Sequence, residues 1–173
     1  MDEKNKLKDS EKNFDIVVST SNISFFRNIK HLEKSNNVDS RRSLTLLFVT
    51  KGKIKLEMNK MTIVGKRHDM IVCPPNLVRS NSKTSTNFEG NAIVLSNDFL
   101  LSIISNERIK WAKIFNQRML PLVHLDDEFM HLLDCYEKLL LKRVTVFRGS
   151  MFDSVISHLT LAFLSELQCY KEK

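Results

Sequence analysis

The sequence predicts an α+β fold, in which a small β-barrel or sandwich is followed by a C-terminal antiparallel pair of helices. Two observations support this prediction. In the first part of the chain, short runs rich in Val, Ile, Leu and Thr are separated by turn-forming stretches, which is typical of a small all-β unit. In the last third, apolar side chains recur every three or four positions, which is the period of amphipathic helices.

The β-rich part is organised around residues 44–75. Residues 54–59 alternate apolar and polar side chains, so we expect one buried and one wet face. Residues 44–50 are almost all apolar, as expected of a strand covered on both faces. Gly52 and residues 65–69 are expected to be turns. The other candidate strands are residues 14–18, 61–64, 70–73 and 91–95, and residues 23–29 are either a further strand or an aromatic lead-in. The expected polar loops are residues 33–42 and 80–87.

The helices follow capping signals. Ser96 or Asn97 can cap a short helix, and Asp126 can cap a longer one that starts with acidic residues, which suits the helix dipole. Ser150 opens the last helix, after an expected break at residues 144–149. A further short helical piece is expected at residues 107–116. The apolar stripes of the two long helices are formed by residues 129, 132, 133, 136, 139 and 140, and by residues 152, 155, 156, 159, 163 and 167.

The composition is that of an ordinary globular protein. The chain has 173 residues, 42% hydrophobic and 27% charged, which suits one domain or one domain with an appendage. No apolar run is long enough to span a membrane and no signal-peptide core is visible, so the expected location is the cytoplasm, away from membranes. Cys73, Cys135 and Cys169 show no metal-binding or redox spacing and are expected to be packing residues.

The formal net charge is +7. Residues 43–100 carry 8 Lys and Arg against 4 Asp and Glu, so the excess lies mainly in the β-rich part. A nucleic-acid surface usually shows a basic stripe on a helix or basic residues among stacking aromatics, and neither is visible in the sequence. Charge alone therefore identifies no partner.

Catalytic chemistry finds little support in the sequence. His31, His68, His124, His131 and His158 form no cluster of the type that holds a catalytic metal, so neither a metal nor another cofactor is expected. No nucleophile elbow and no phosphate-binding glycine loop are present. The pair Asp126-Asp127 is interpreted as helix-cap chemistry. We therefore expect a protein that is not an enzyme.

Four stretches, in order, resemble the N-terminal regulatory domain of AraC-type transcription regulators. They are LTLLFVTKG at residues 44–52, TIVGKRHDMIVCPP at 62–75, AIVLSNDFLL at 92–101, and the helix pair at 125–141 and 150–168. The resemblance implies a cupin-like β-barrel of the double-stranded β-helix type at residues 14–96. A flexible tail at residues 1–13 would precede it, and a helical dimerisation element at residues 97–173 would follow.

The sequence departs from the family pattern in places. His68-Asp69 stands where the family often has Gly-Asp, and Arg79 stands where a histidine is frequent. No counterpart of the family's helix-turn-helix units is found in these residues, so DNA contact is expected only through a domain absent from this chain.

The resemblance implies an effector-binding and dimerisation domain that controls an attached DNA-binding domain. The expected effector pocket is lined by Phe48, Leu56, Met58 and Met70, with Arg42 and Arg79 as polar anchors at its mouth. A solid core with solvated arginines is the alternative for these six residues. The lining expected for this pocket is mostly aliphatic, which favours an apolar or acidic effector. The residues expected to form a homodimer interface are Phe129, Leu132, Leu133, Tyr136, Leu140, Ile156, Leu159 and Phe163.

Two other functions stay open at this point. One is a stand-alone cupin-type enzyme, which a bound transition metal would reveal. The other is a small-molecule-binding protein without any link to DNA.

Overall fold

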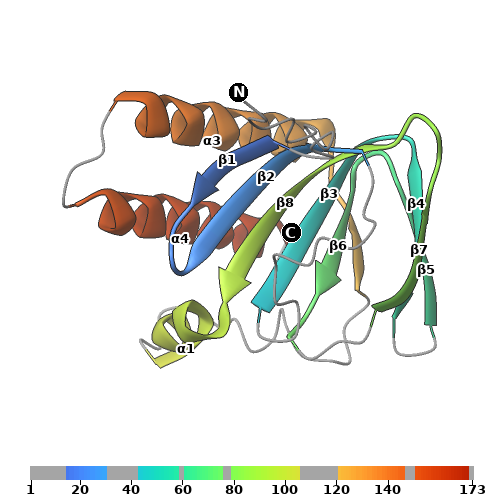
Figure 1. Ribbon diagram of the computed structural model, residues 1–173, viewed down its shortest axis with the longest axis horizontal. Helices are drawn as coiled ribbons and strands as arrows, with labels where there is room; N and C mark the ends of the chain where they lie inside the picture. The colour runs from blue at the N-terminus through green and yellow to red at the C-terminus, as the bar shows by residue number, and fades with distance from the viewer. Residues whose placement is uncertain are drawn as a thin grey trace, which may run out of the picture.

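The computed structural model describes residues 15–30, 43–58, 61–75, 79–105, 121–146 and 151–171. These residues form three layers: a helix pair, a six-stranded sheet and a three-stranded sheet (Figure 1). The strands are β1 (Asp15–Ser19), β2 (Ile23–Ile29), β3 (Ser43–Lys51), β4 (Lys53–Met58), β5 (Met61–Lys66), β6 (Asp69–Cys73), β7 (Arg79–Thr84), β8 (Glu89–Ser96) and β9 (Leu122–His124). The helices are α1 (Asn97–Ser105), α3 (Asp127–Val146) and α4 (Phe152–Lys171).

The large sheet separates two apolar cores. Its strand order is β1-β2-β8-β3-β6-β9, with antiparallel pairing throughout. On β3, Leu46 and Phe48 belong to the core under α3 and α4, whereas Leu47 and Val49 belong to the core shared with the small sheet. The prediction that this strand is covered on both faces is therefore confirmed. Both faces of a central strand are apolar because each meets a different layer.

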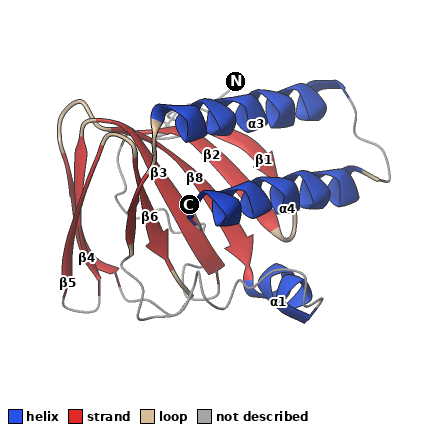
Figure 2. Ribbon diagram, turned by 180° about the vertical axis from the view of Figure 1, so that it is seen from behind, coloured by secondary structure: helices blue, strands red, loops and turns tan. Residues whose placement is uncertain are grey.

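The small sheet has the order β5-β4-β7 and lies on the side of the large sheet that faces away from α3 and α4 (Figure 2). Two sequence predictions are corrected here. Residues 79–84 form strand β7, not a loop, and Gly65 lies within β5, not in a turn. A Cβ at Gly65 would lie only 2.8 Å from the end of the Ile71 side chain, so any larger residue would force this buried side chain to shift.

The strands form an antiparallel β-sandwich with a C-terminal helix pair. In the described part of the chain the two sheets end at β1, β9, β5 and β7, and they do not join into one closed barrel. The predicted α+β architecture is confirmed at this level. Closure into a double-stranded β-helix barrel is not seen.

The predicted helix caps are present. The Ser96 Oγ accepts a hydrogen bond from the Phe99 N–H at 3.1 Å, and the Asp126 Oδ1 accepts one from the Phe129 N–H at 2.8 Å. Helix α3 continues to Val146, past the start of the predicted break at residues 144–149. The expected helical piece at residues 107–116 and the cap at Ser150 lie outside the described residues.

The helices and the cysteines allow two further predictions to be compared with the structure. None of the helices in the described ranges is both long and apolar enough to span a membrane. Cys73 is buried as expected, but Cys135 and Cys169 are exposed, so these two are not packing residues.

Candidate functional site

An aromatic cluster joins the large sheet to both long helices. The Phe163 ring of α4 lies 6.0 Å from the Phe48 ring of β3, 5.8 Å from the Phe129 ring and 5.2 Å from the Tyr136 ring of α3, measured between centroids. The Phe48 and Tyr136 rings meet Phe163 edge-on, and contacts of this kind contribute about 0.5–1.5 kcal/mol each beyond area burial. Phe163 is therefore the point at which the sheet, α3 and α4 meet.

Beside this cluster lies a small apolar cavity between the sheet and the helices. Its free volume is about 10 Å³, roughly the space of one water molecule. Tyr136 and Thr160 are the lining residues that carry a hydroxyl group, and Thr160 is buried. The full lining is Val18, Ile23, Phe25, Ile93, Leu133, Tyr136, Leu140, Ile156, Leu159, Thr160 and Phe163.

A buried polar cluster continues the same interface. The Glu137 Oε1 of α3 lies 2.9 Å from the Arg27 Nε of β2, and its Oε2 accepts a hydrogen bond from the Asn91 Nδ2 of β8 at 3.0 Å. Glu137 lies one helical turn from Leu133 and from Leu140, which both line the cavity. The polar cluster and the cavity are thus neighbours on one face of α3.

Burial changes the acidity of two groups on α3. Burial raises the pKa of Glu137, and the nearby Asp134 raises it further, whereas Arg27 and Lys138 lower it. Burial, followed by the charge of Glu166, also raises the pKa of Tyr136. Tyr136, which lines the cavity, therefore keeps a neutral hydroxyl group.

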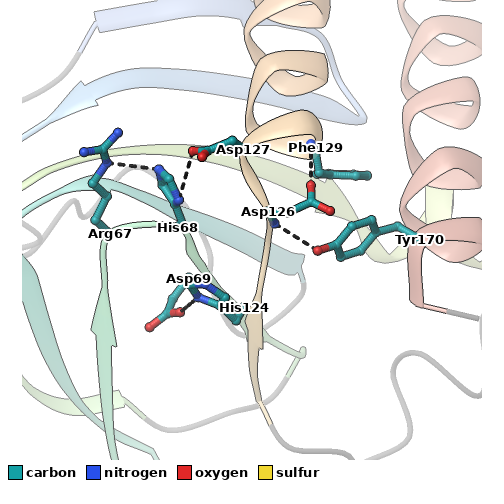
Figure 3. A network of polar contacts seen from close by, with 8 residues as sticks. All are labelled: Arg67, His68, Asp69, His124, Asp126, Asp127, Phe129 and Tyr170. Atoms are coloured by element: carbon teal, nitrogen blue, oxygen red, sulfur yellow. Dashed lines mark hydrogen bonds and ion pairs between the residues drawn. The ribbon is translucent and has the colours of Figure 1, made fainter. Parts of the chain in front are cut away.

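A second polar network fixes the start of α3 to the sheet (Figure 3). The Nδ1 of the exposed His124 of β9 lies 2.8 Å from the Oδ1 of Asp69. The Oδ2 of Asp69 accepts a hydrogen bond from the Lys66 N–H at 2.8 Å. The Asp126 N–H donates to the Tyr170 hydroxyl of α4 at 2.9 Å. The segment before α3 is thus held from β6 and from the end of α4.

His68 belongs to the same network. Its Nε2 accepts a hydrogen bond from the Arg67 Nε at 3.0 Å, and its Nδ1 lies 3.5 Å from the Asp127 Oδ1. Its φ is +72°, a left-handed value that favours glycine. The His68 backbone bonds to Val49 on one side and to Leu125 on the other, which holds this conformation.

The residues expected to line a pocket are not brought together. Phe48 and Met70 pair across β3 and β6 and face the helices, whereas Leu56 and Met58 lie in the core between the two sheets. All four are almost fully buried. Arg42 and the side chain of Arg79 lie outside the described residues.

Most residues expected at a dimer interface contribute to the core of their own chain. Five of them are at most 7% exposed: Phe129, Leu133, Leu140, Ile156 and Phe163. Leu132, Tyr136 and Leu159 are partly buried and pack against the same core. Six of the eight, all except Phe129 and Leu132, line the cavity.

Sequence reasoning missed both polar networks. One signal was available for the first: Glu137 follows Leu133 by four positions, so it lies in the apolar stripe of α3. For Asp69 and His124 no local signal exists, because they are 55 positions apart and meet only through the pairing of β6 with β9. In the described ranges, no group of three or more His, Cys, Asp or Glu side chains is arranged to hold a metal.

Comparison with known proteins gives structural similarity only. No family model and no curated protein match the chain. Similar solved structures include an apo variant of ToxT from Vibrio cholerae, at 13% identity and a TM-score of 0.49, over 75% of this chain and 49% of that one. ToxT from Vibrio cholerae O395 bound to (E)-4-(8-methylnaphthalen-1-yl)but-3-enoic acid matches at 16% identity and a TM-score of 0.45, over 92% of this chain and 58% of that one.

A cupin domain is among the similar structures as well. The cupin domain of Cnp3 from Schizosaccharomyces pombe matches at 11% identity and a TM-score of 0.39, over 53% of this chain and 69% of that one. The chain spans about half the length of the ToxT structures that it matches.

Proposed function

We propose that this chain is the ligand-sensing and dimerisation domain of an AraC-like transcription regulator, without catalytic activity, and that its ligand binds between the large sheet and the helix pair. One observation carries the proposal: the apolar cavity is lined by β1, β2 and β8 on one side and by α3 and α4 on the other. A molecule bound there touches both helices and three strands of the sheet beneath them.

Because the cavity is small, a ligand can bind there only if the helices move. A free volume of about 10 Å³ holds no organic ligand, so an occupant has to displace α3 or α4 from the sheet. A ligand that binds only the displaced arrangement shifts the population toward it by its differential affinity. The helices thereby become the output of the sensor, and an attached DNA-binding domain would respond to them.

The lining favours an apolar ligand with an acidic group. The walls are almost entirely hydrocarbon, which suits an alkyl chain or an apolar ring system. Arg27 is the nearby cation, and its side chain is 42% exposed. Its Nε faces Glu137, and a guanidinium carries further N–H groups that can bind a carboxylate in a two-pronged geometry.

A pair of matched variants tests this site. Dodecanoate and dodecanol are titrated into the purified chain, and binding is measured by calorimetry and by the rise in melting temperature. Leu159→Trp fills the cavity from a partly buried position and is expected to weaken dodecanoate binding at least tenfold. Leu139→Trp makes the same change at an exposed position of α3 and is expected to leave binding within about twofold.

The possible results distinguish binding of an apolar acidic ligand in the cavity from binding elsewhere. Tighter binding of dodecanoate than of dodecanol supports a role for Arg27. Failure of the natural chain to bind either compound would contradict an apolar acidic ligand. Equal weakening by Leu159→Trp and Leu139→Trp would place binding elsewhere on the molecule.

A further inference from the structure

The outer face of the small sheet gathers lysines that are scattered in the sequence. Lys53 and Lys55 on β4, Lys66 on β5 and Lys83 on β7 are all exposed. Ile54 and Leu56, which alternate with the β4 lysines, are buried between the sheets, so the lysines point the opposite way. We refer to these four residues as the lysine face.

The lysines are aligned in register across the strands. Lys53 lies directly opposite Lys66, and Lys55 lies directly opposite Lys83. Like charges placed opposite each other destabilise a sheet. The described residues include no ion pair to any of the four ammonium groups, although the nearby Lys51 of β3 is paired with Glu89 at 3.5 Å. Glu57, the next outward residue of β4 after Lys55, adds one negative charge to this side of the sheet. The four lysines outnumber it, so the lysine face is a concentration of positive charge.

Protection of sheet edges does not explain this arrangement. Lysine is common on edge strands, where it prevents pairing with other chains, and Lys66 and Lys83 do lie on the edge strands β5 and β7. Lys53 and Lys55 lie on β4, the central strand, which needs no such protection. Edge protection therefore does not explain the two lysines of β4.

We propose that the lysine face binds the phosphate backbone of duplex nucleic acid without reading its sequence. Duplex DNA carries one negative charge per about 1.7 Å of its axis, and lysines that replace its counterions gain affinity from counterion release. The face spans roughly 10 Å across three strands and about 7 Å between Lys53 and Lys55. Several phosphates of one duplex fit over such a compact patch.

The composition of the face favours a duplex over other anionic partners. A protein interface has a core rich in aromatic and apolar residues and poor in lysine, whereas Val64 of β5 is the exposed apolar residue between these lysines. Single-stranded nucleic acid is held by stacking on aromatic rings, and Lys53, Lys55, Lys66 and Lys83 are aligned with each other and with Val64, not with aromatic residues. An anionic membrane offers a plane of charge much wider than this narrow patch.

The position of the face is compatible with the sensor function. It lies on the opposite side of the molecule from α3 and α4, so DNA bound there leaves the helix pair free (Figure 1). This inference does not depend on the ligand cavity, because the two surfaces share no residue. Failure of dodecanoate to bind and failure of DNA to bind are therefore independent results.

The test uses Lys53→Glu together with Lys55→Glu. These changes replace both like-charge pairs by opposite-charge pairs, so the melting temperature is expected to be equal to or above that of the natural chain. Binding to a duplex of mixed sequence is measured by fluorescence anisotropy at several salt concentrations. The natural chain is expected to show a log–log salt slope near −3.6 for about four phosphate contacts, and the variant to bind at least tenfold more weakly with a slope of about half or less.

The control variant is Lys142→Glu with Arg143→Glu. Both residues are exposed on α3, and the change in net charge is the same as for the lysine face. We expect this control to retain DNA affinity within about threefold.

Three outcomes would overturn the proposal. They are absence of DNA binding by the natural chain at low salt, equal losses in the two variants, and binding of polyglutamate or of phosphatidylserine vesicles at least as tight as binding of the duplex.

Discussion

At the scale of residues, Glu137 shows how one side chain can position α3 on the sheet. Its carboxylate is buried, yet it receives a guanidinium from β2 and an amide from β8. Replacing a buried ion pair by apolar residues is often neutral or stabilising, so such a pair is poor evidence for stability. A polar group in the apolar stripe instead favours this register of α3 on the sheet, because the register pairs Glu137 with both Arg27 and Asn91.

The raised pKa of Glu137 predicts a pH-dependent contribution to stability. Because the folded-state pKa lies above the unfolded value, its contribution is fully present below the unfolded pKa and is lost as pH rises through the folded pKa. The free energy of unfolding of the natural chain should therefore increase relative to that of Glu137→Gln as pH falls from 7 to about 4, so the natural chain becomes relatively more stable. Urea denaturation of both proteins across this range measures the difference. A difference that is constant, or that shrinks at low pH, would contradict the prediction.

At the scale of elements, most of the helix residues expected to form a dimer interface lie in the core of their own chain. Leu133 and Leu140 are buried in the core of their own chain, so they are not free to meet a second copy. Leu139 is 43% exposed, and Leu132 lies two turns before it, partly buried on the same side of α3. If the proposed homodimer forms through α3, this outer side is the surface that remains for it.

Two aspartate substitutions separate association from folding. Leu139→Asp is expected to change stability by less than about 0.5 kcal/mol and to weaken dimerisation at least tenfold. Leu133→Asp is expected to unfold the chain, since it buries an unpaired charge in the core. Sedimentation and urea denaturation measure the two effects. A natural chain that is monomeric at high micromolar concentration would contradict the dimer.

Elements with a local signal could be predicted from the sequence, and elements defined by distant contacts could not. Ser96 and Asp126 cap their helices as expected, because capping depends on neighbours within three residues. Strand β7 was missed because its residues, RSNSKT, are polar on both faces and carry no apolar alternation. Its inward positions Ser82 and Thr84 lie opposite Leu56 and Ile54, which only the sheet pairing reveals.

The candidate site shows the same limit. Residues 44–50 are apolar on both faces, so the sequence alone does not show which side chains face which core. The pocket expected from Phe48 and Leu56 therefore combined residues from opposite sides of the large sheet. The cavity lies elsewhere, against helices that the sequence assigned to dimerisation.

At the scale of the whole molecule, the sheet and the helices share one core. The cluster under the helices takes side chains from five strands of the large sheet and from α1, α3 and α4. The network of Asp69, His124, Asp126 and Tyr170 ties the same parts together at the start of α3. Neither layer has a separate apolar interior on the helix side. We therefore expect the sheet and the helix pair to unfold together.

This expectation predicts the result of a truncation. A chain that ends at residue 125 lacks α3 and α4 and exposes a row of sheet side chains that are now almost fully buried: Phe25, Leu44, Leu46, Phe48, Met70, Ile93 and Leu95. Each such side chain contributes about 1.5–3 kcal/mol by burial, whereas a whole domain is stable by only about 5–15 kcal/mol. The truncated chain should therefore aggregate or lack a cooperative thermal transition. The full chain should show coincident transitions by far-UV and by near-UV circular dichroism. A truncated chain that is soluble and unfolds cooperatively would show instead that the two sheets fold without the helices.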